Sequence, residues 1–154
     1  MSDISKILDN LRRQCSRREY CTSDVLKKAE KALEGDKEKA MQVVVTLVEE
    51  KFVDDLRYAS AYAREKSAIS GWGEVKIRYM LSAKGIARDV IAQALAEVDP
   101  NRADSRLIKL LENKYRTLRE DPQCKLKLLR FALGRGYSYD EVSGHIDALM
   151  KKDK

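Results

Sequence analysis

The chain has 154 residues, a length typical of one domain, with 44% hydrophobic residues, 36% charged residues and a net charge of +6. This composition predicts a water-soluble protein with a densely charged surface. No apolar run reaches the roughly 18 residues of a membrane span, and the N-terminus lacks the basic-then-apolar order of a signal peptide. We therefore expect a cytoplasmic protein without a membrane partner.

The residues that commonly carry metal or nucleophilic chemistry are sparse. Cys15, Cys21 and Cys124 form no C-x-x-C pair, and His145 is the only histidine, expected at the surface. This pattern argues against a disulfide framework and a zinc site, so we expect semi-buried free thiols. There is no phosphate-binding G-x-x-x-x-G-K-[ST] motif. We therefore expect no metal, no cofactor and no enzymatic activity.

Helical spacing of apolar residues recurs along the whole chain, with few prolines and little β-branched alternation. Gly35, Gly85 and Gly136 lie 50 and 51 residues apart, each between two amphipathic segments. Each glycine is well placed to end a helix with a positive φ. The period predicts an all-α, elongated array of three tandem three-helix repeats, at residues 1–53, 54–100 and 101–154.

The first repeat contains the string Ser-Arg-Arg-Glu-Tyr at residues 16–20. We interpret this string as a corner between two helices, which Tyr20 closes while Glu19 pairs locally.

The middle repeat begins with Asp54 and Asp55, because carboxylates favour a helix start. The helix that these two residues start places Tyr58, Tyr62 and Ile69 on one face. The sequence "SGWG" at residues 70–73 then breaks the helix. We expect the ring of Trp72 to plug this corner near Ile77 and Tyr62, although tryptophan is also common in binding hot spots. The structural corner residues are Gly71, Trp72, Gly73 and Gly85.

Two further helices complete the middle repeat. The second carries Ile77, Met80 and Leu81 on its inward face, and the third runs from Ala87 to Val98.

The last repeat is strongly basic, with ten basic and four acidic residues between positions 102 and 135. Its first helix places Leu107, Leu110, Leu111 and Leu118 on one arc of the helical wheel and its cations on the opposite arc. Its second helix begins near Pro122. That helix is expected to bury Leu126, Leu129 and Leu133, and the third to bury Val142, Ile146, Leu149 and Met150.

The segment from residue 47 to 98 resembles the central signature of the RecX family, bacterial regulators of the RecA recombinase. The matching residues are Glu49, Glu50, Phe52, Val53, Asp54, Asp55, Arg57, Tyr58, Ala61, Tyr62, Arg64, Lys66, Gly71, Trp72, Gly73, Ile77, Leu81, Lys84, Gly85 and Ile86. Residues 16–20 also match the family's opening helix junction. Lys51 and Glu74 depart from the pattern, where glycine and proline are common, but neither removes a functional group.

The resemblance implies a non-catalytic regulator that docks along the RecA–DNA filament and suppresses ATP hydrolysis and strand exchange. We expect a monomer that contacts RecA and, non-specifically, single- or double-stranded DNA. The charge pattern and the resemblance together predict these partner-binding residues: Arg57, Arg64, Lys66, Lys84, Arg88, Arg102, Arg106, Lys109, Arg116, Lys125, Lys127 and Arg130.

Two alternatives stay open. The cationic residues are also compatible with a stand-alone DNA-binding protein, since three-helix units with a sharp turn resemble helix-turn-helix readers. The third helices are poor in Arg, Asn and Gln and carry several acids, so such binding would be electrostatic and not sequence-specific. Individual cations are also commonly no more than solvated surface.

Overall fold

The computed structural model describes residues 2–153, and the side chains from residue 4 onward. Every regular element in this range is an α-helix, as the sequence predicts. The helices in chain order are α1 (Ser2–Arg17), α2 (Thr22–Ala32), α3 (Lys37–Glu49), α4 (Asp55–Ala68), α5 (Glu74–Ala83), α6 (Arg88–Ala96), α7 (Pro100–Leu118), α8 (Cys124–Gly134) and α9 (Tyr139–Lys152). No described helix is both long and apolar enough to cross a membrane.

The chain forms two compact units. The first unit runs to Tyr62 and includes Leu81–Ala94, and the second comprises Ala63–Met80 and everything from Leu95 onward. Helices α4, α5 and α6 each pass from one unit into the other. The division into repeats at residues 1–53, 54–100 and 101–154 therefore stays a prediction.

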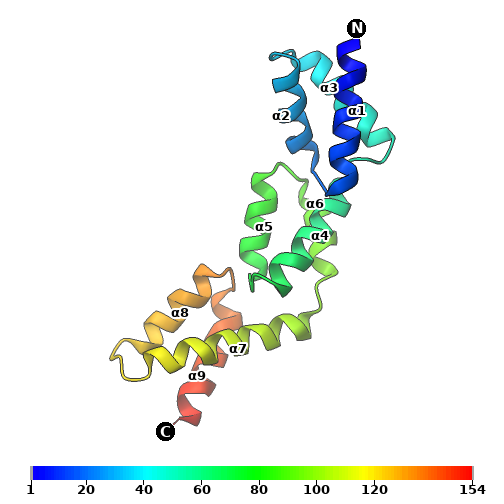
Figure 1. Ribbon diagram of the computed structural model, residues 1–154. Coiled ribbons are helices and arrows are strands. Elements are labelled where there is room, and N and C mark those ends of the chain that lie inside the picture. The colour runs from blue at the N-terminus through cyan, green and yellow to red at the C-terminus, as the bar shows by residue number, and fades with distance from the viewer. Residues whose placement is uncertain (1, 154) are drawn as a thin grey trace. The chain divides into compact units, whose positions relative to one another are not determined.

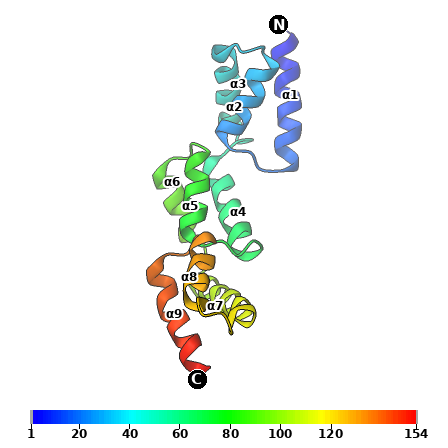
Figure 2. The ribbon, with the colours of Figure 1, turned by 90° about the vertical axis from the view of Figure 1, so that its left-hand side faces the viewer.

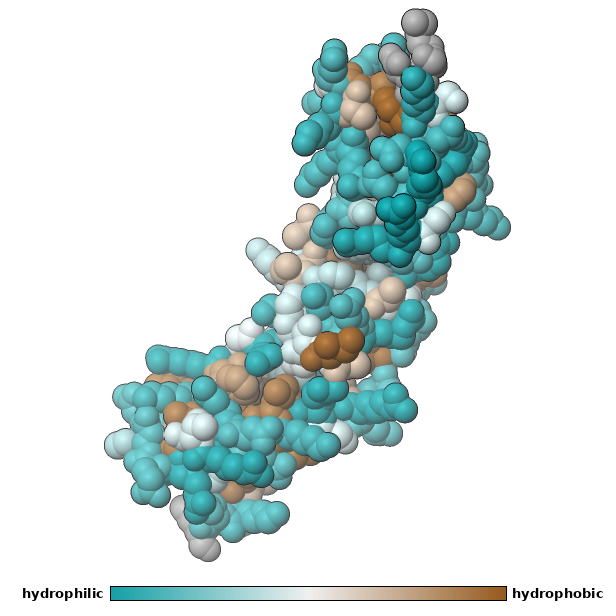
Figure 3. All heavy atoms as spheres, in the orientation of Figure 1, coloured by the Kyte–Doolittle hydropathy of each residue, from teal (hydrophilic) through white to brown (hydrophobic). Residues whose placement is uncertain are grey.

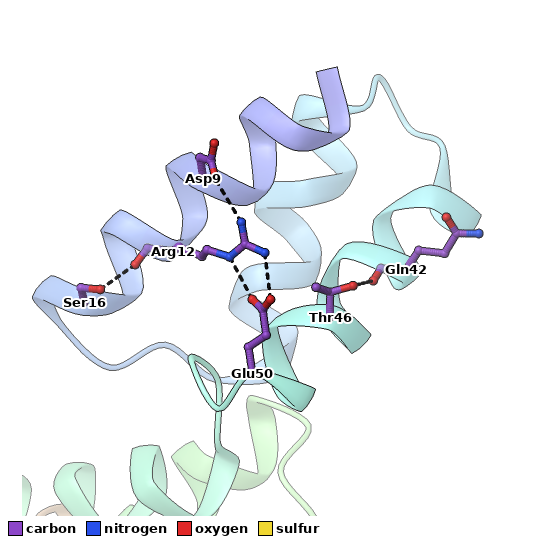
Figure 4. Close-up of polar contacts among 6 residues, drawn as sticks. All are labelled: Asp9, Arg12, Ser16, Gln42, Thr46 and Glu50. Atoms are coloured by element: carbon purple, nitrogen blue, oxygen red, sulfur yellow. Dashed lines mark hydrogen bonds and ion pairs between the residues drawn. The ribbon is translucent and has the colours of Figure 1, made fainter. Parts of the chain in front are cut away.

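Helices α1, α2 and α3 pack side by side around the core of the first unit (Figures 1 and 2). Its buried residues are Leu11, Val25, Ala29, Ala40, Val43, Val44, Leu47 and Val53. A bidentate ion pair also joins α1 to the end of α3. The Nε and Nη2 atoms of Arg12 each lie 2.9 Å from a carboxylate oxygen of Glu50, while Nη1 contacts Asp9 (Figure 4). The guanidinium lowers the pKa of Glu50 by stabilising its charged form.

The second unit has its own core between α7, α8 and α9. This core contains Leu107, Leu111, Cys124, Leu128, Ala132, Tyr137, Val142 and Ile146. The predicted apolar arc of α7 is confirmed, since Leu107 and Leu111 are buried and Leu110 and Leu118 pack against the core. The face shown in Figure 3 is mainly hydrophilic, with apolar side chains scattered among charged ones over α7 to α9.

The helix breaks fall where the sequence places them. Gly35, Gly85 and Gly136 have φ values of 88°, 78° and 98°, and α4 ends before the corner at residues 70–73. Helix α4 begins as predicted, because the Asp54 carboxylate accepts a hydrogen bond from the backbone N–H of Arg57. Serine at position 138 and Glu141 form a capping box at the start of α9.

The predicted inward face of α8 is only partly confirmed, because Leu129 packs against the core but the other two predicted leucines lie at the surface. Leu126 and Leu133 are 41% and 43% exposed, whereas Cys124, Leu128 and Ala132 form the buried stripe. Leucines lie on several sides of this helix, so periodicity alone does not show which face is buried. Packing against α7 and α9 determines the buried face.

Two other apolar residues lie outside the predicted core. Ile69 follows the end of α4 and is 77% exposed, and Met80 also lies at the surface, while Ile77 and Leu81 are buried as predicted. Ile69 therefore lies in the turn after α4, and Met80 lies on the solvent-facing side of α5.

Candidate functional site

Two of the predicted partner-binding cations are engaged within the first unit. Nε of Arg57 lies 2.6 Å from Glu19, and Nζ of Lys84 lies 2.7 Å from Asp24. Glu19 therefore pairs across 38 positions of sequence, and the prediction of a local pair was wrong. Tyr20 is half-buried against the first core, with Arg18 and Lys28 near its ring, which fits a corner residue.

The same region contains two further polar links to the start of α2. The backbone N–H of Thr22 donates to Asp55 (2.7 Å), and the Ser23 hydroxyl donates to the carbonyl of Lys84 (2.6 Å). Burial opposes ionisation of Asp24, but hydrogen bonds from Lys84 and Cys21 outweigh it, so the pKa of Asp24 is lowered. The hydrogen bond to Asp24 in turn raises the pKa of Lys84. We call this cluster the polar joint.

The polar joint predicts a pH-dependent stability. A lowered carboxylate pKa contributes stability above the ordinary Asp value of about 3.9, and this contribution is lost as the pH falls through the folded value. We expect Asp24→Asn to lower the free energy of unfolding by about 1 kcal/mol at pH 7. In urea unfolding followed by circular dichroism, the difference from wild type should shrink at pH 3.

The exposed pair between Lys125 and Asp147 provides the control, since Asp147→Asn removes the same charge from a solvated pair. We expect Asp147→Asn to change the free energy of unfolding at pH 7 by less than Asp24→Asn does. An Asp24→Asn difference that stays constant between pH 7 and pH 3 would contradict the role assigned to the ion pair.

A second joint lies within the second unit, where the corner at residues 70–73 contacts the turn between α8 and α9. The backbone N–H groups of Gly73 and Val75 donate to the carbonyls of Arg135 (2.8 Å) and Gly136 (2.9 Å). The Arg135 guanidinium also donates to the carbonyl of Ser70 (2.9 Å). We call this contact the glycine joint, because a Cβ at Gly73 would lie 2.4 Å from the Gly136 oxygen.

Trp72 lies beside the glycine joint and is half-buried. The ammonium groups of Lys66 and Lys76 lie 4.9 Å and 4.4 Å from the centre of its ring. Such cation–π contacts hold the ring against the protein surface. The plug role of this side chain remains a prediction, and Lys66 is partly occupied by the contact.

The exposed arc of α7 carries a row of cations. The Arg102 side chain is 91% exposed, Lys109 is exposed, and Arg106 donates a hydrogen bond to the carbonyl of Ala68. A hollow of about 570 Å³ lies along this row, lined by Asn101, Arg102, Ser105, Arg106, Lys109, Leu110 and Asn113. Its lining contains three cations and no carboxylate.

A neighbouring hollow has a different charge balance. It shares Arg102 and Arg106 with the first and also contains Arg64, but Glu97 and Asp99 lie in its wall. Arg64 approaches Glu97 to 3.7 Å, and Arg102 approaches Asp99 to 3.9 Å. Positive charge is therefore partly neutralised on this side of the row.

The remaining candidate cations divide between paired and solvated side chains. Lys125 lies 3.0 Å from Asp147, and Lys127 pairs with Asp121. Arg116 contacts Asn113, while Arg88 and Arg130 are exposed and have no ion pair among the described residues. Ion pairs between distant segments produce no pattern in the sequence. Cations with a carboxylate partner therefore could not be distinguished from cations without one.

The structure also tests the predictions for the histidine and the cysteines. His145, which we expected at the surface, is half-buried, and its Nε2 lies 2.8 Å from Asp104 on α7. The three thiols are free as predicted, but only Cys15 is half-buried, whereas Cys21 and Cys124 are buried. Desolvation raises the pKa of all three. Within residues 4–153, no three His, Cys, Asp or Glu side chains are grouped closely enough to hold a metal ion.

These features define a class of protein: an all-α tandem array of helical units with tight glycine turns and cationic exposed faces. Two family profiles match the chain. One, described as "RecX, second three-helix domain", matches residues 54–95, and the other, "RecX, third three-helix domain", matches residues 103–144.

Named relatives agree with these profiles. "Regulatory protein RecX" of Vibrio parahaemolyticus is 35% identical over 115 residues, which cover 73% of this chain and 72% of the relative. The protein of the same name from Clostridium tetani is 29% identical over 150 residues, covering 86% of this chain and 68% of the relative. The chain belongs to the RecX family of regulatory proteins.

The fold is also found in a solved structure. The crystal structure of RecX from Lactobacillus salivarius has a TM-score of 0.82 at 23% identity, covering 96% of this chain and 97% of that one. Some relatives are longer, since the chain spans 51% and 55% of the length of two Clostridium botulinum proteins.

Proposed function

We propose that this protein binds the RecA–DNA filament and inhibits ATP hydrolysis and strand exchange by the recombinase, without catalysis of its own. The observation that carries the proposal is the match of 54–95 and 103–144 to two RecX domains. Relatives with matching sequences are named regulatory proteins. We further propose that it acts in the cytoplasm as a monomer.

The proposed contact surface consists of exposed cations on several helices. A three-repeat array would present one such helix face after another, which suits a partner with repeating subunits. Arg88, Lys109 and Arg130 are the best candidates, because they are exposed and make no ion pair among the described residues. Arg57 and Lys84 would have to leave Glu19 and Asp24 before they bind a partner.

An ATPase assay tests the proposal. Added at micromolar concentration to RecA on single-stranded DNA, the protein should slow DNA-dependent ATP hydrolysis several-fold. The expected reason is that ligand binding to the filament shifts it toward a less active or shorter state. Unchanged hydrolysis, with helical folding verified by circular dichroism, would rule the proposal out.

A second candidate function is stand-alone, non-sequence-specific DNA binding, which the carboxylate-free hollow on α7 favours. The two functions differ in whether inhibition of ATP hydrolysis depends on binding to DNA alone or on binding to the RecA filament. If DNA binding alone acts, any inhibition should disappear when DNA is in large excess over both proteins. Inhibition that follows the ratio of this protein to RecA instead favours a filament contact.

A further inference from the structure

The hollow along the cationic row of α7 differs from the other candidate surfaces because no carboxylate lines it. Arg102, Arg106 and Lys109 share one hollow with the neutral side chains of Asn101, Ser105 and Asn113. By contrast, Arg57, Lys84 and Lys125 each lie within 3.0 Å of a carboxylate. Arg102 approaches the Asp99 carboxylate only to 3.9 Å, and Lys109 is exposed and makes no ion pair among the described residues. The positive charge of the row is therefore largely available to an external anion, whereas the charge of those three residues is largely satisfied within the protein.

The acids of α7 lie toward α9 and away from this row. Asp104 is hydrogen-bonded to His145 on α9 (2.8 Å), and Glu112 lines a separate small pocket of about 190 Å³ with His145 and Lys152. The two faces of α7 thus carry opposite chemistry. An anion that approaches the hollow meets no carboxylate along its lining.

The spacing of the row suits a chain of regularly repeated charges. In an α-helix, positions 102, 106 and 109 are separated by about 6 Å and about 4.5 Å along the axis. Arg106 is held in place by its hydrogen bond to the carbonyl of Ala68. The amide and hydroxyl groups that line the hollow with the cations are typical donors to phosphate oxygens, which they bind without adding charge.

We infer that the hollow on α7 binds the phosphodiester backbone of a nucleic-acid strand, and that this face is the DNA-contacting part of the proposed filament interface. The inference rests on the proposed function for its biological setting, but DNA alone suffices to test it. Phosphate fits better than a carboxylate-bearing protein face, because three neutral donors and three cations converge along one helix. Exposed Arg102 and Lys109 would supply the counterion release.

The test uses the full chain and a fluorescein-labelled mixed-sequence single-stranded oligonucleotide, without RecA. Binding is measured by fluorescence anisotropy over a range of salt concentrations. For single strands, each neutralised phosphate contributes about 0.7 to the slope of log K against log salt. The double variant Arg102→Gln, Lys109→Gln should therefore flatten the slope by up to about 1.4 and weaken binding equally for different sequences.

The matched control is Lys125→Gln, Lys127→Gln, which removes the same charge from two lysines with carboxylate partners in the same unit. We expect it to change the slope by less than half as much. Both double variants alter exposed side chains only, and circular dichroism verifies that each is folded. Equal slopes for the two double variants, or no change from wild type, would overturn the inference.

Competition distinguishes phosphate from carboxylate. Inorganic polyphosphate should displace the oligonucleotide from wild type at lower concentrations of charge than poly-glutamate. Equal displacement by poly-glutamate would overturn the assignment to phosphate and indicate an acidic protein face. Inhibition of RecA by the Arg102→Gln, Lys109→Gln variant at the wild-type level would leave the proposed function intact while removing α7 from its interface.

Discussion

Replacing Gly136 with alanine should destabilise the second unit by about 3 kcal/mol. Two costs combine at this position. Its φ of 98° is in the region that side chains rarely adopt, and an added Cβ would lie 2.3 Å from the Cβ of Lys76 and 2.7 Å from its backbone nitrogen. The clash involves backbone, so it cannot be relieved by rotation of a flexible side chain. Trp72 lies beside this joint, and its fluorescence during urea unfolding reports on the change directly.

Gly73→Ala and Gly144→Ala separate the causes. Gly73 has no positive φ, but its Cβ would lie 2.4 Å from the Gly136 oxygen, so this variant measures the steric cost alone. Gly144 lies inside α9 with nothing within 4 Å, and alanine there should stabilise by up to about 1 kcal/mol. Unfolding of Gly136→Ala at the same urea concentration as wild type would contradict the close contact between Gly136 and Lys76 at the glycine joint.

Leu128→Ala should cost about 2–5 kcal/mol, because the side chain is fully buried between α7, α8 and α9. Truncation there removes contacts and leaves a cavity in the core of the second unit. Leu133→Ala removes the same atoms from the same helix, but Leu133 is 43% exposed. We expect this control to cost less than about 1 kcal/mol.

This pair of variants tests which face of α8 is buried, by urea unfolding with Trp72 fluorescence and circular dichroism. A larger cost at position 133 than at position 128 would restore the face that periodicity suggests and contradict the packing. The comparison is sharp because both residues are leucines in the same helix. Helix propensity is therefore the same in the two variants, and only burial differs.

The class of fold and the helix breaks were predictable because their causes are local. A glycine with positive φ, as at positions 85 and 136, and a capping carboxylate, as at Asp54, act within a few residues of themselves. The apolar arc of α7 was also predictable, because only one side of that helix is rich in leucine. Family membership followed from the dense motif in the middle of the chain.

The candidate site was predictable only as a set of cations. Whether a given lysine or arginine is free depends on carboxylates far away in the sequence, such as Asp24 for Lys84 and Glu19 for Arg57. No periodicity encodes a pair that is 60 positions apart. The structure therefore sorted the cations into paired and unpaired groups, and it revealed the carboxylate-free hollow on α7.

The corner at Gly71, Trp72 and Gly73 shows the same division. The helix break at this corner was predictable from the sequence, because two glycines in four residues disfavour continuation of the helix. The contact of this corner with the turn at Arg135 and Gly136 came from the packing of the helices. It is made by backbone hydrogen bonds from Gly73 (2.8 Å) and from Val75 in the first turn of α5 (2.9 Å). Local conformation depends on neighbouring residues, whereas contacts between distant segments depend on how whole helices pack, and the same local pattern is compatible with many packings.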